Sequence, residues 1–313
     1  MILVTGAAGF AGSHLIDRLS EQGLPIVGCY RSGGRVPPPR LGVDWQALDV
    51  VNRDEVMAAM MRIAPTAVYH CAAASNVGRA WNRAEATLAI NVRGTQFVLE
   101  AAVETGAALG RPIPVLVPSS AMVYRRADRP LAEDDPLQPP NPYGLTKLAI
   151  ELLAARMVAE GADIRIVRPF NHIGARQYPS FVASDFARQI VEIERGRRDP
   201  EMVVGNLEAR RELTNVRDTV RAYELVMAHG VAGRPYNVSS GTAVSIRELL
   251  DRLIAHAHVS VRVRVDPTKF HPNDLPLLVG DPTRIQTELG WRPSIPLDDT
   301  LDEVLDYWRT EMP

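Results

Sequence analysis

The sequence predicts an α/β protein in which a doubly wound parallel sheet is joined to a smaller, interleaved C-terminal unit. Short aliphatic runs alternate with longer amphipathic or alanine-rich stretches, the runs being ILVT, PIVGCY, AVYHCA, PVLVPSS and IRIVRPF. Such alternation is typical of parallel strands with helices on both faces of the sheet. After Pro169 loops and charges become more frequent, yet RPYNVSS near residue 234 has the character of one more buried strand.

The remaining elements follow from local patterns. LDDTLDEVLDYWR places Leu301, Val304, Leu305 and Trp308 at helical spacing, which predicts a helix anchored in a core. The proline-rich stretches 35–40 and 130–142 are expected to be surface connections.

Composition narrows the class of partner. The 313 residues include 35 Lys and Arg against 37 Asp and Glu, so a net charge of −2 disfavours nucleic acid or an anionic membrane. We therefore expect a small-molecule partner. The chain begins with a strand-like segment and has no signal segment or apolar run near 18 residues, so we expect a cytoplasmic location. Cys29 and Cys71 are expected to be buried reduced thiols, and no metal site is expected.

The first chemical signal is TGAAGFAGSHL, in which Gly6, Gly9 and Gly12 stand between the first strand and a helix. Small residues let the backbone approach a pyrophosphate, and the helix N-terminus favours its negative charge. Glycines also serve an ordinary tight turn. The position after a strand and before a helix favours a dinucleotide site.

The residue that follows the second strand bears on the choice of dinucleotide. Arg31 in CYRSGG stands where an NAD enzyme has an acid for the ribose hydroxyls. A guanidinium suits a 2′-phosphate, so NADPH is preferred, with NADH still possible. Asp49, followed by Val50, is placed to accept from the adenine amino group or to cap the next helix.

The second signal is PYGLTK, where Tyr143 and Lys147 lie four apart and so share one helix face. We expect the ammonium to lower the tyrosine pKa, which suits proton exchange with an alcohol oxygen. The strand-end segment SSAMVY, with Ser119 and Ser120, would complete such a site.

These motifs, with NVRGT and the GW.P pattern near the end, resemble the extended short-chain dehydrogenases/reductases over the whole chain. RPFNHIG, FVASDFARQIVEIE, VVGNLEARRELTNVRD and YNVSSG are similar to the GDP-4-keto-6-deoxy-D-mannose reductases within that family. The resemblance implies a Rossmann-type NADP(H)-binding unit of residues 1–170 with 214–240. It implies a nucleotide-sugar unit of residues 171–213 with 241–313.

Residue by residue, the resemblance implies that Ser120, Tyr143 and Lys147 are catalytic and that Ser119 is structural. It implies cofactor contacts, beyond the glycines, Arg31, Tyr143 and Lys147, at Phe10, Ala11, Asp49, Val50, Ala72, Ala73, Asn91 and Pro169. It implies substrate contacts at Ser75, Asn171, Val182, Arg211, His271 and Asp274. His70 and His14 are expected to be structural.

Alternatives remain for several of these contacts. Asn171 could be a turn residue, and Arg211, favoured as a diphosphate ligand, could form a surface ion pair. KFHPNDLP departs from the Arg-Pro-Ser/Thr-Glu pattern of relatives, and HIGARQ departs from Gly-Pro-Gly-Gln, so Arg176 is either a phosphate contact or a solvated side chain.

Met122 bears on the reaction. Dehydratases of this family place a glutamate two residues before the tyrosine that ends the SSAMVY segment, and here that residue is Met122. A thioether cannot accept the sugar C5 proton, so the elimination that makes a 4-keto-6-deoxy sugar lacks its base. Glu133, Asp134 and Asp135 are expected to be solvated and badly placed to replace it.

The favoured interpretation is an NADPH-dependent reductase of the C4 keto group of GDP-4-keto-6-deoxy-D-mannose, giving GDP-D-rhamnose or its C4 epimer. The alternatives are a nucleotide-sugar 4-epimerase with tightly bound NAD, a GDP-mannose 4,6-dehydratase, disfavoured by Met122, and a dinucleotide-sensing protein without turnover. The resemblance also implies a homodimer formed through the helices near 84–108 and 143–160.

Overall fold

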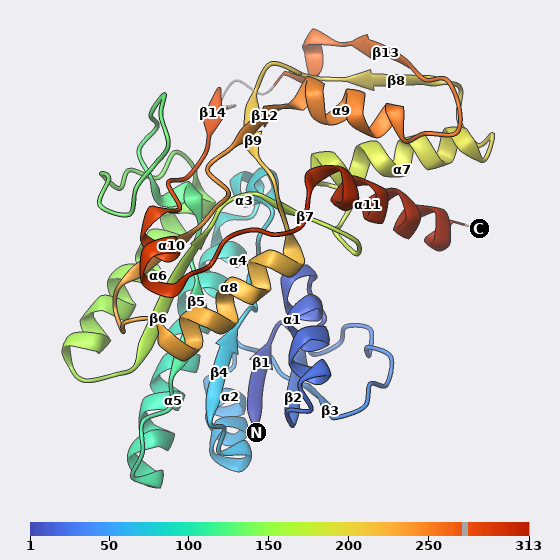
Figure 1. Ribbon diagram of the computed structural model, residues 1–313. Helices are drawn as coiled ribbons and strands as arrows, with labels where there is room; N and C mark the ends of the chain where they lie inside the picture. Colours follow the sequence, from blue (N-terminus) through green and yellow to red (C-terminus); the bar gives the residue numbers. More distant parts are fainter. Residues whose placement is uncertain (271–274, 313) are drawn as a thin grey trace.

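The computed structural model describes residues 1–270 and 275–312 and is built around one parallel sheet (Figure 1). Its seven strands lie in the order β11 (Pro235–Val238), β6 (Ile164–Pro169), β5 (Val115–Pro118), β4 (Ala67–His70), β1 (Ile2–Thr5), β2 (Ile26–Tyr30) and β3 (Val43–Ala47). Every pairing between neighbours is parallel. The predicted doubly wound fold is confirmed, as is the buried strand near residue 234.

Helices cover both faces of this sheet because the strands are apolar on both sides. Leu3 packs toward α2 (Arg53–Ile63), α5 (Gly94–Leu109) and α6 (Pro142–Ala159). Its neighbour Val4 packs toward α1 (Phe10–Glu21) and α8 (Val216–His229). Successive strand side chains point to opposite faces, so a continuous apolar run fills two cores.

The strand order reverses beside β1, whose neighbours are β4 on one side and β2 on the other. In open parallel sheets, ligands bind at the carboxyl edge where the order reverses. The loops after β1, β2, β4 and β5 meet at this edge, and they contain most of the predicted cofactor and catalytic residues.

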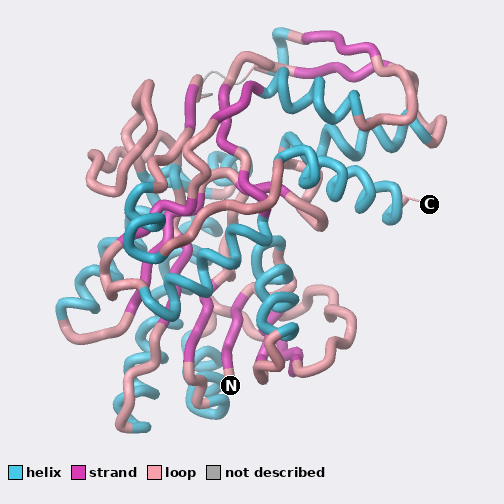
Figure 2. Tube along the Cα trace, viewed as in Figure 1, coloured by secondary structure: helices cyan, strands magenta, loops and turns pink. Residues whose placement is uncertain are grey.

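A second group of elements has its own core (Figure 2). It contains α7 (Val182–Glu194), α9 (Ile246–Ala255) and α11 (Leu297–Glu311), with the paired strands β8 (Glu201–Val204) and β13 (Arg262–Val265). Leu301, Val304 and Leu305 are buried, and the half-buried Trp308 donates to Ser184 at 3.1 Å. The predicted core anchors of the last helix are confirmed.

Short elements connect the two groups. They are β9 (Arg210–Glu212), β12 (Ala243–Ser245) and β14 (Leu277–Leu278) in one small sheet, β7 (His172–Ile173) paired with β10 (Thr214–Asn215), and the helices α3 (Val77–Asn82), α4 (Ala84–Leu88) and α10 (Thr283–Leu289). A π-helical turn spans Ala89–Arg93, and 3-10 turns span Ala121–Val123 and Pro267–Lys269. The exact division of the chain into two units stays a prediction.

Two further expectations concern loops and thiols. The stretch 35–40 is largely exposed, but 130–142 is not a simple surface loop, because Leu131 is 4% and Glu133 is 7% exposed. Cys29 is buried and Cys71 partly buried, and both are free thiols. Across residues 1–270 and 275–312, no helix combines the length and apolar character needed to cross a membrane.

Candidate active site

The loop between β1 and α1 forms a cradle whose glycines cannot be replaced without displacement. Gly6 has φ +63°, and a Cβ there would lie 2.5 Å from the Ala72 backbone nitrogen. A Cβ on Gly12 would lie 2.2 Å from the Gly6 carbonyl oxygen. The first turn of α1, with Phe10 and Ala11, therefore packs directly against the turn, leaving its N-terminus bare for an anion. This geometry fits a dinucleotide pyrophosphate, and the role of these residues as cofactor contacts stays a prediction.

The residues predicted to select the adenosine end lie at the same sheet edge. Arg31 follows β2 directly and is exposed. Asp49 is also exposed, and its Oδ1 accepts from the Val51 nitrogen at 3.0 Å, whereas α2 is capped by Asn52. Val50 is buried and packs against Gly94, so its side chain is a core residue.

The loop after β4 is held from behind by Asn91, which is 1% exposed within the π-helical turn. Its Oδ1 accepts from the Ala74 nitrogen at 2.8 Å, and its Nδ2 donates to the Thr146 Oγ1 at 2.9 Å. Ala72 and Ala73 lie in this loop. The Asn91 side chain thus orients the loop and α6, and its amide is fully engaged.

Two histidines pack as structural groups, as expected. His70 lies between Thr5 and Thr95, with ring nitrogens 2.8 and 3.0 Å from their hydroxyls, and burial lowers its pKa to about 3. His14 interacts with the Ala175 carbonyl at 2.9 Å, and burial followed by Arg176 lowers its pKa to about 4. Arg176 has φ +69° and its partly exposed side chain donates to Asp17 and interacts with His14.

The three predicted catalytic residues meet at the ends of β5 and α6. Asn141 caps α6 by accepting from the Gly144 nitrogen at 2.8 Å, and Pro142 starts the helix, which puts Tyr143 in the first turn. Lys147 follows one turn later and donates to the Pro118 carbonyl at 2.8 Å. Ser120, Tyr143 and Lys147 are 8%, 8% and 5% exposed.

Burial sets the protonation of this group. Burial raises the pKa of Tyr143 to about 12, and a hydrogen bond from Ser120 opposes the rise. Burial lowers the pKa of Lys147 to about 8. The expectation that Lys147 brings the tyrosine pKa down toward neutrality is wrong here, because its ammonium lies 5.9 Å from the ring centroid and desolvation dominates. A neutral phenol is a proton donor ready for use.

Met122 packs against the start of α6. A Cβ on Gly144 would lie 2.2 Å from the Met122 carbonyl oxygen, so the glycine permits the close approach of the two segments. The Asn141 Nδ2 lies 3.5 Å from the Met122 Sδ. Ser119 is buried, and its hydroxyl has no partner among the described residues.

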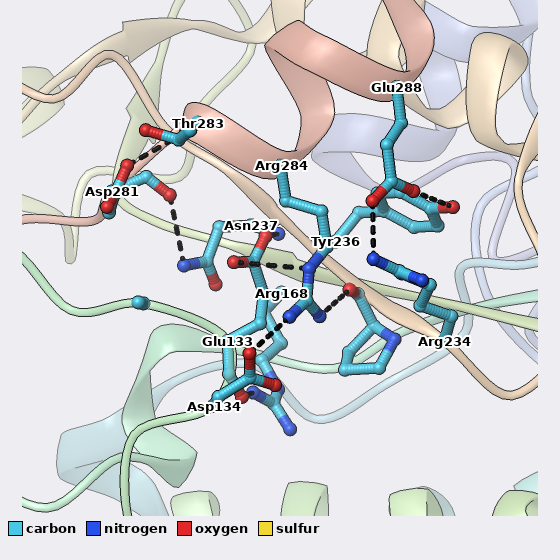
Figure 3. Close-up of polar contacts among 12 residues, drawn as sticks. Glu133, Asp134, Arg168, Arg234, Tyr236, Asn237, Asp281, Thr283, Arg284 and Glu288 are labelled. Atoms are coloured by element: carbon cyan, nitrogen blue, oxygen red, sulfur yellow. Dashed lines mark hydrogen bonds and ion pairs between the residues drawn. The ribbon is translucent and has the colours of Figure 1, made fainter.

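Glu133 is buried, contrary to the expectation that it is solvated (Figure 3). The proline-flanked stretch that contains it folds against β11, where its Oε1 accepts from the Asn237 nitrogen at 2.9 Å. The Arg284 Nε lies 3.7 Å from its Oε2. Asp134 and Asp135 pair with Arg284 and Arg129. Glu133 and Asp135 are thus engaged within the fold, whereas the Asp134 side chain is 88% exposed and solvated, as expected.

A cavity of about 510 Å³ lies beside β9 and α7, within the second group of elements. It brings together Asn171, Val182 and Arg211, three of the predicted substrate contacts. Arg211 is half-buried and donates to the Leu275 carbonyl at 2.5 Å. Asn171 follows β6, whose last residue is the buried Pro169.

The other residues of the cavity region do not match the predicted substrate contacts. Ser75 is exposed outside the cavity, but the adjacent Asn76 donates to Ser180 on the cavity wall at 2.8 Å. Sequence reasoning missed Gln189 and Lys269, which line the cavity. Both lie in stretches that the sequence analysis compares with relatives, so the polar residues of those stretches were the signal that could have identified them. His271 and Asp274 lie outside the described residues.

A larger cavity, of about 1110 Å³, lies between α1, α8 and the start of α11 and contains none of the predicted site residues. Its arginines are paired with acids, as Arg217 is with Glu303 and Arg221 with Asp218. The sheet edge with Ser120, Tyr143 and Lys147 is therefore the better candidate site.

The chain is similar to known proteins over nearly its whole length. The model of the family described as GDP-mannose 4,6 dehydratase matches residues 3–304. A GDP-6-deoxy-D-mannose reductase from Pseudomonas aeruginosa is 32% identical over 99% of this chain and 98% of its own length. A dTDP-glucose 4,6-dehydratase from Streptomyces griseus is 33% identical over 98% of this chain and 93% of its own.

Among solved structures, one described as RMD from Pseudomonas aeruginosa complexed with NADPH superposes with a TM-score of 0.83. It is 30% identical and covers 99% of each chain.

Proposed function

The chain belongs to the GDP-mannose 4,6 dehydratase family of extended short-chain dehydrogenases/reductases, and from this premise we propose that it is an NADPH-dependent reductase. Its substrate is a GDP-linked 4-keto-6-deoxy sugar, GDP-4-keto-6-deoxy-D-mannose, and the C4 keto group becomes a hydroxyl. The similar reductase from Pseudomonas aeruginosa supports this substrate class.

The reaction divides between cofactor and side chains. NADPH, when bound along the glycine loop, supplies the hydride that reaches the sugar C4. Tyr143 donates its phenolic proton to the oxygen that becomes the alcohol, and Ser120 hydrogen-bonds the same oxygen. The Lys147 ammonium lies 5.9 Å from the Tyr143 ring centroid, and its positive charge favours the phenolate that proton transfer leaves, although it does not outweigh burial in the resting phenol. Hydride plus proton gives the alcohol, so the atoms balance.

The observation that decides the branch of the family is Met122. Identity does not decide it, because the reductase and the dehydratase are 32% and 33% identical to the chain. Removal of the C5 proton needs a base, and the side chain at this position is a thioether. The three nearby acids of the loop after β5 are held by Asn237, Arg284 and Arg129.

Cofactor preference follows from Arg31, which is exposed at the end of β2 with no acid in its place. A guanidinium attracts a 2′-phosphate and has no counterpart on NADH. The similar structure complexed with NADPH agrees with this preference.

The outer faces of two helices bear on whether the chain pairs with a second copy of itself. Val103 on α5, and Leu145 and Leu152 on α6, are 45%, 56% and 64% exposed, which gives these helices an apolar outer face. We propose a homodimer formed by α5 and α6 of each copy. Light scattering should give twice the 34.4 kDa chain mass at micromolar concentration, and a monomer mass would contradict the proposal.

The deciding experiment mixes the enzyme, NADPH and freshly made GDP-4-keto-6-deoxymannose and identifies the product by NMR. We expect a GDP-6-deoxyhexose with a C4 hydroxyl. In parallel, the enzyme is given GDP-mannose and NADP⁺ in deuterated water. Loss of the C6 hydroxyl with deuterium at C5 would place the chain among the dehydratases instead.

A further inference from the structure

Arg168, in the buried strand β6, joins three segments that the proposed chemistry does not use directly. Its side chain is 4% exposed and faces Glu151, which is 8% exposed. The Nε donates to the Glu151 Oε1 at 3.0 Å and an Nη to the Oε2 at 2.7 Å, a two-pronged pair. The other Nη donates to the Tyr124 hydroxyl at 2.9 Å and to the Glu133 carbonyl at 2.8 Å.

The partners of Arg168 belong to both halves of the candidate active site. Tyr124 ends the SSAMVY segment, which contains the proposed catalytic residue Ser120. Its hydroxyl donates to the Asn237 Oδ1 at 2.6 Å, which ties that segment to β11 as well (Figure 3 shows Arg168, Glu133 and Asn237). Glu151 follows Lys147 by four residues on α6, so the two side chains share one face of that helix.

Stability alone does not explain this pair. Taking two charges out of water is costly, and replacing such pairs with apolar residues is often neutral or stabilising. A forked guanidinium does, however, fix the direction of both of its partners.

We propose that Arg168 is a positioning residue that holds the Ser120 segment, through Tyr124, in register with the helix of Tyr143 and Lys147, through Glu151. The inference rests on the proposed function only for the roles of Ser120, Tyr143 and Lys147. In physical terms, the Arg168–Glu151 ion pair fixes the position of Lys147 and the charges that surround it.

The charges around Lys147 make the proposal testable. Three of its neighbours are neutral at pH 8: the Cys71 thiol and the Tyr143 phenol, whose pKa values burial raises to about 12, and the His70 ring, whose pKa is lowered to about 3. Glu151 is then the anion that supports the Lys147 charge, and Arg168 offsets that anion through its two-pronged pair with the carboxylate. Removing the anion and removing the cation should therefore act in opposite directions.

The chain offers a direct readout, because Lys147 and Lys269 are its two lysines. Protein labelled with ε-¹³C lysine gives two side-chain signals, which Lys269→Arg assigns. Wild-type Lys147 should titrate near pH 8, matching its lowered pKa. Glu151→Gln should lower that midpoint and Arg168→Met should raise it, each by about one unit.

The titration needs neither cofactor nor substrate, so it can fail independently of the proposed function. Unchanged midpoints, or shifts of the same sign in both variants, would overturn the proposal. If either single variant does not fold, the double variant Glu151→Gln with Arg168→Met removes both charges and should titrate near the wild-type midpoint. A displaced midpoint in the double variant would also count against it.

Kinetics complete the test. Arg168→Met should lower kcat about 10²-fold, the effect of misplacing reacting groups by about 1 Å, with KM for the nucleotide sugar within about twofold. Arg168→Lys, which keeps the charge without the fork, should recover part of the loss. Glu194→Gln is the matched control, since it breaks a two-pronged pair with Arg309 between α7 and α11. This variant should leave both kcat and the Lys147 titration unchanged. An equal loss of kcat in Arg168→Met and Glu194→Gln would refute the positioning role of Arg168.

Discussion

The sheet edge that holds the proposed catalytic residues and the cavity of the second group are built in different ways. At the sheet edge Ser120, Tyr143 and Lys147 are all less than a tenth exposed and are fixed by hydrogen bonds to backbone or to one another. The cavity is bounded by the short strand β9, a helix face and loops, and its Arg211 is half-buried. Rigid, dry surroundings suit bond-making, whereas loops and short strands can vary to suit different sugar nucleotides.

The difference predicts separate kinetic consequences for substitutions in the two regions. Changes at the sheet edge should lower kcat, and changes in the cavity should raise KM.

The largest effect is expected for Tyr143→Phe, which deletes the proton donor and keeps the ring. We expect a loss of about 10²- to 10⁴-fold in kcat, the usual contribution of general acid catalysis, with NADPH binding retained. Stopped-flow hydride transfer and cofactor fluorescence measure the two quantities. Tyr178→Phe, at a ring 58% exposed, is the control, and near-normal turnover of the Tyr143 variant would remove the proposed mechanism.

Gly144→Ala tests whether the site requires the close approach of the Ser120 segment to α6. The new Cβ would lie 2.2 Å from the Met122 carbonyl, so the helix must move away. We expect kcat to fall about 10²-fold through misplacement, and less than for Tyr143→Phe. Gly78→Ala is the control, because its Cβ would meet its nearest atom at an ordinary 3.5 Å. Equal kinetics for both variants would mean that the segments can separate freely.

Arg211→Ala probes the cavity side of the comparison. Loss of a charged hydrogen-bond donor to a diphosphate should raise KM for the nucleotide sugar about 10- to 100-fold with little change in kcat. The adjacent Arg210 is exposed and donates to the Ala243 carbonyl, so Arg210→Ala is the matched control. A fall in kcat with unchanged KM in Arg211→Ala would contradict the proposed difference between the sheet edge and the cavity.

Arg31→Asp should give the smallest effect, because this side chain is exposed. The ratio of kcat/KM for NADPH over NADH should fall about tenfold or more, since an attractive charge becomes repulsive toward the 2′-phosphate. An unchanged ratio, or a wild type that already favours NADH, would show that Arg31 does not select the cofactor.

Local patterns were sufficient for much of the site. The glycine turn, the four-residue spacing of Tyr143 and Lys147, and Ser120 at a strand end each depend on neighbours within a few residues. The structure brings them together because parallel strands place their carboxyl ends at one edge. The lining of the second-group cavity was predicted less completely, since Gln189 and Lys269 line it without having been named and Ser75 lies outside it.

The sequence by itself determined the parallel α/β fold, the dinucleotide turn and the absence of an acid at position 122, because each is a property of short stretches. Tertiary structure decided the surroundings of charged and polar groups. Glu133 is buried since it bonds to Asn237, 104 positions away, and Tyr143 has a raised pKa since distant segments exclude water from it. Burial and long-range pairing depend on which segments meet after folding, and this is not encoded in the spacing of neighbours along the chain.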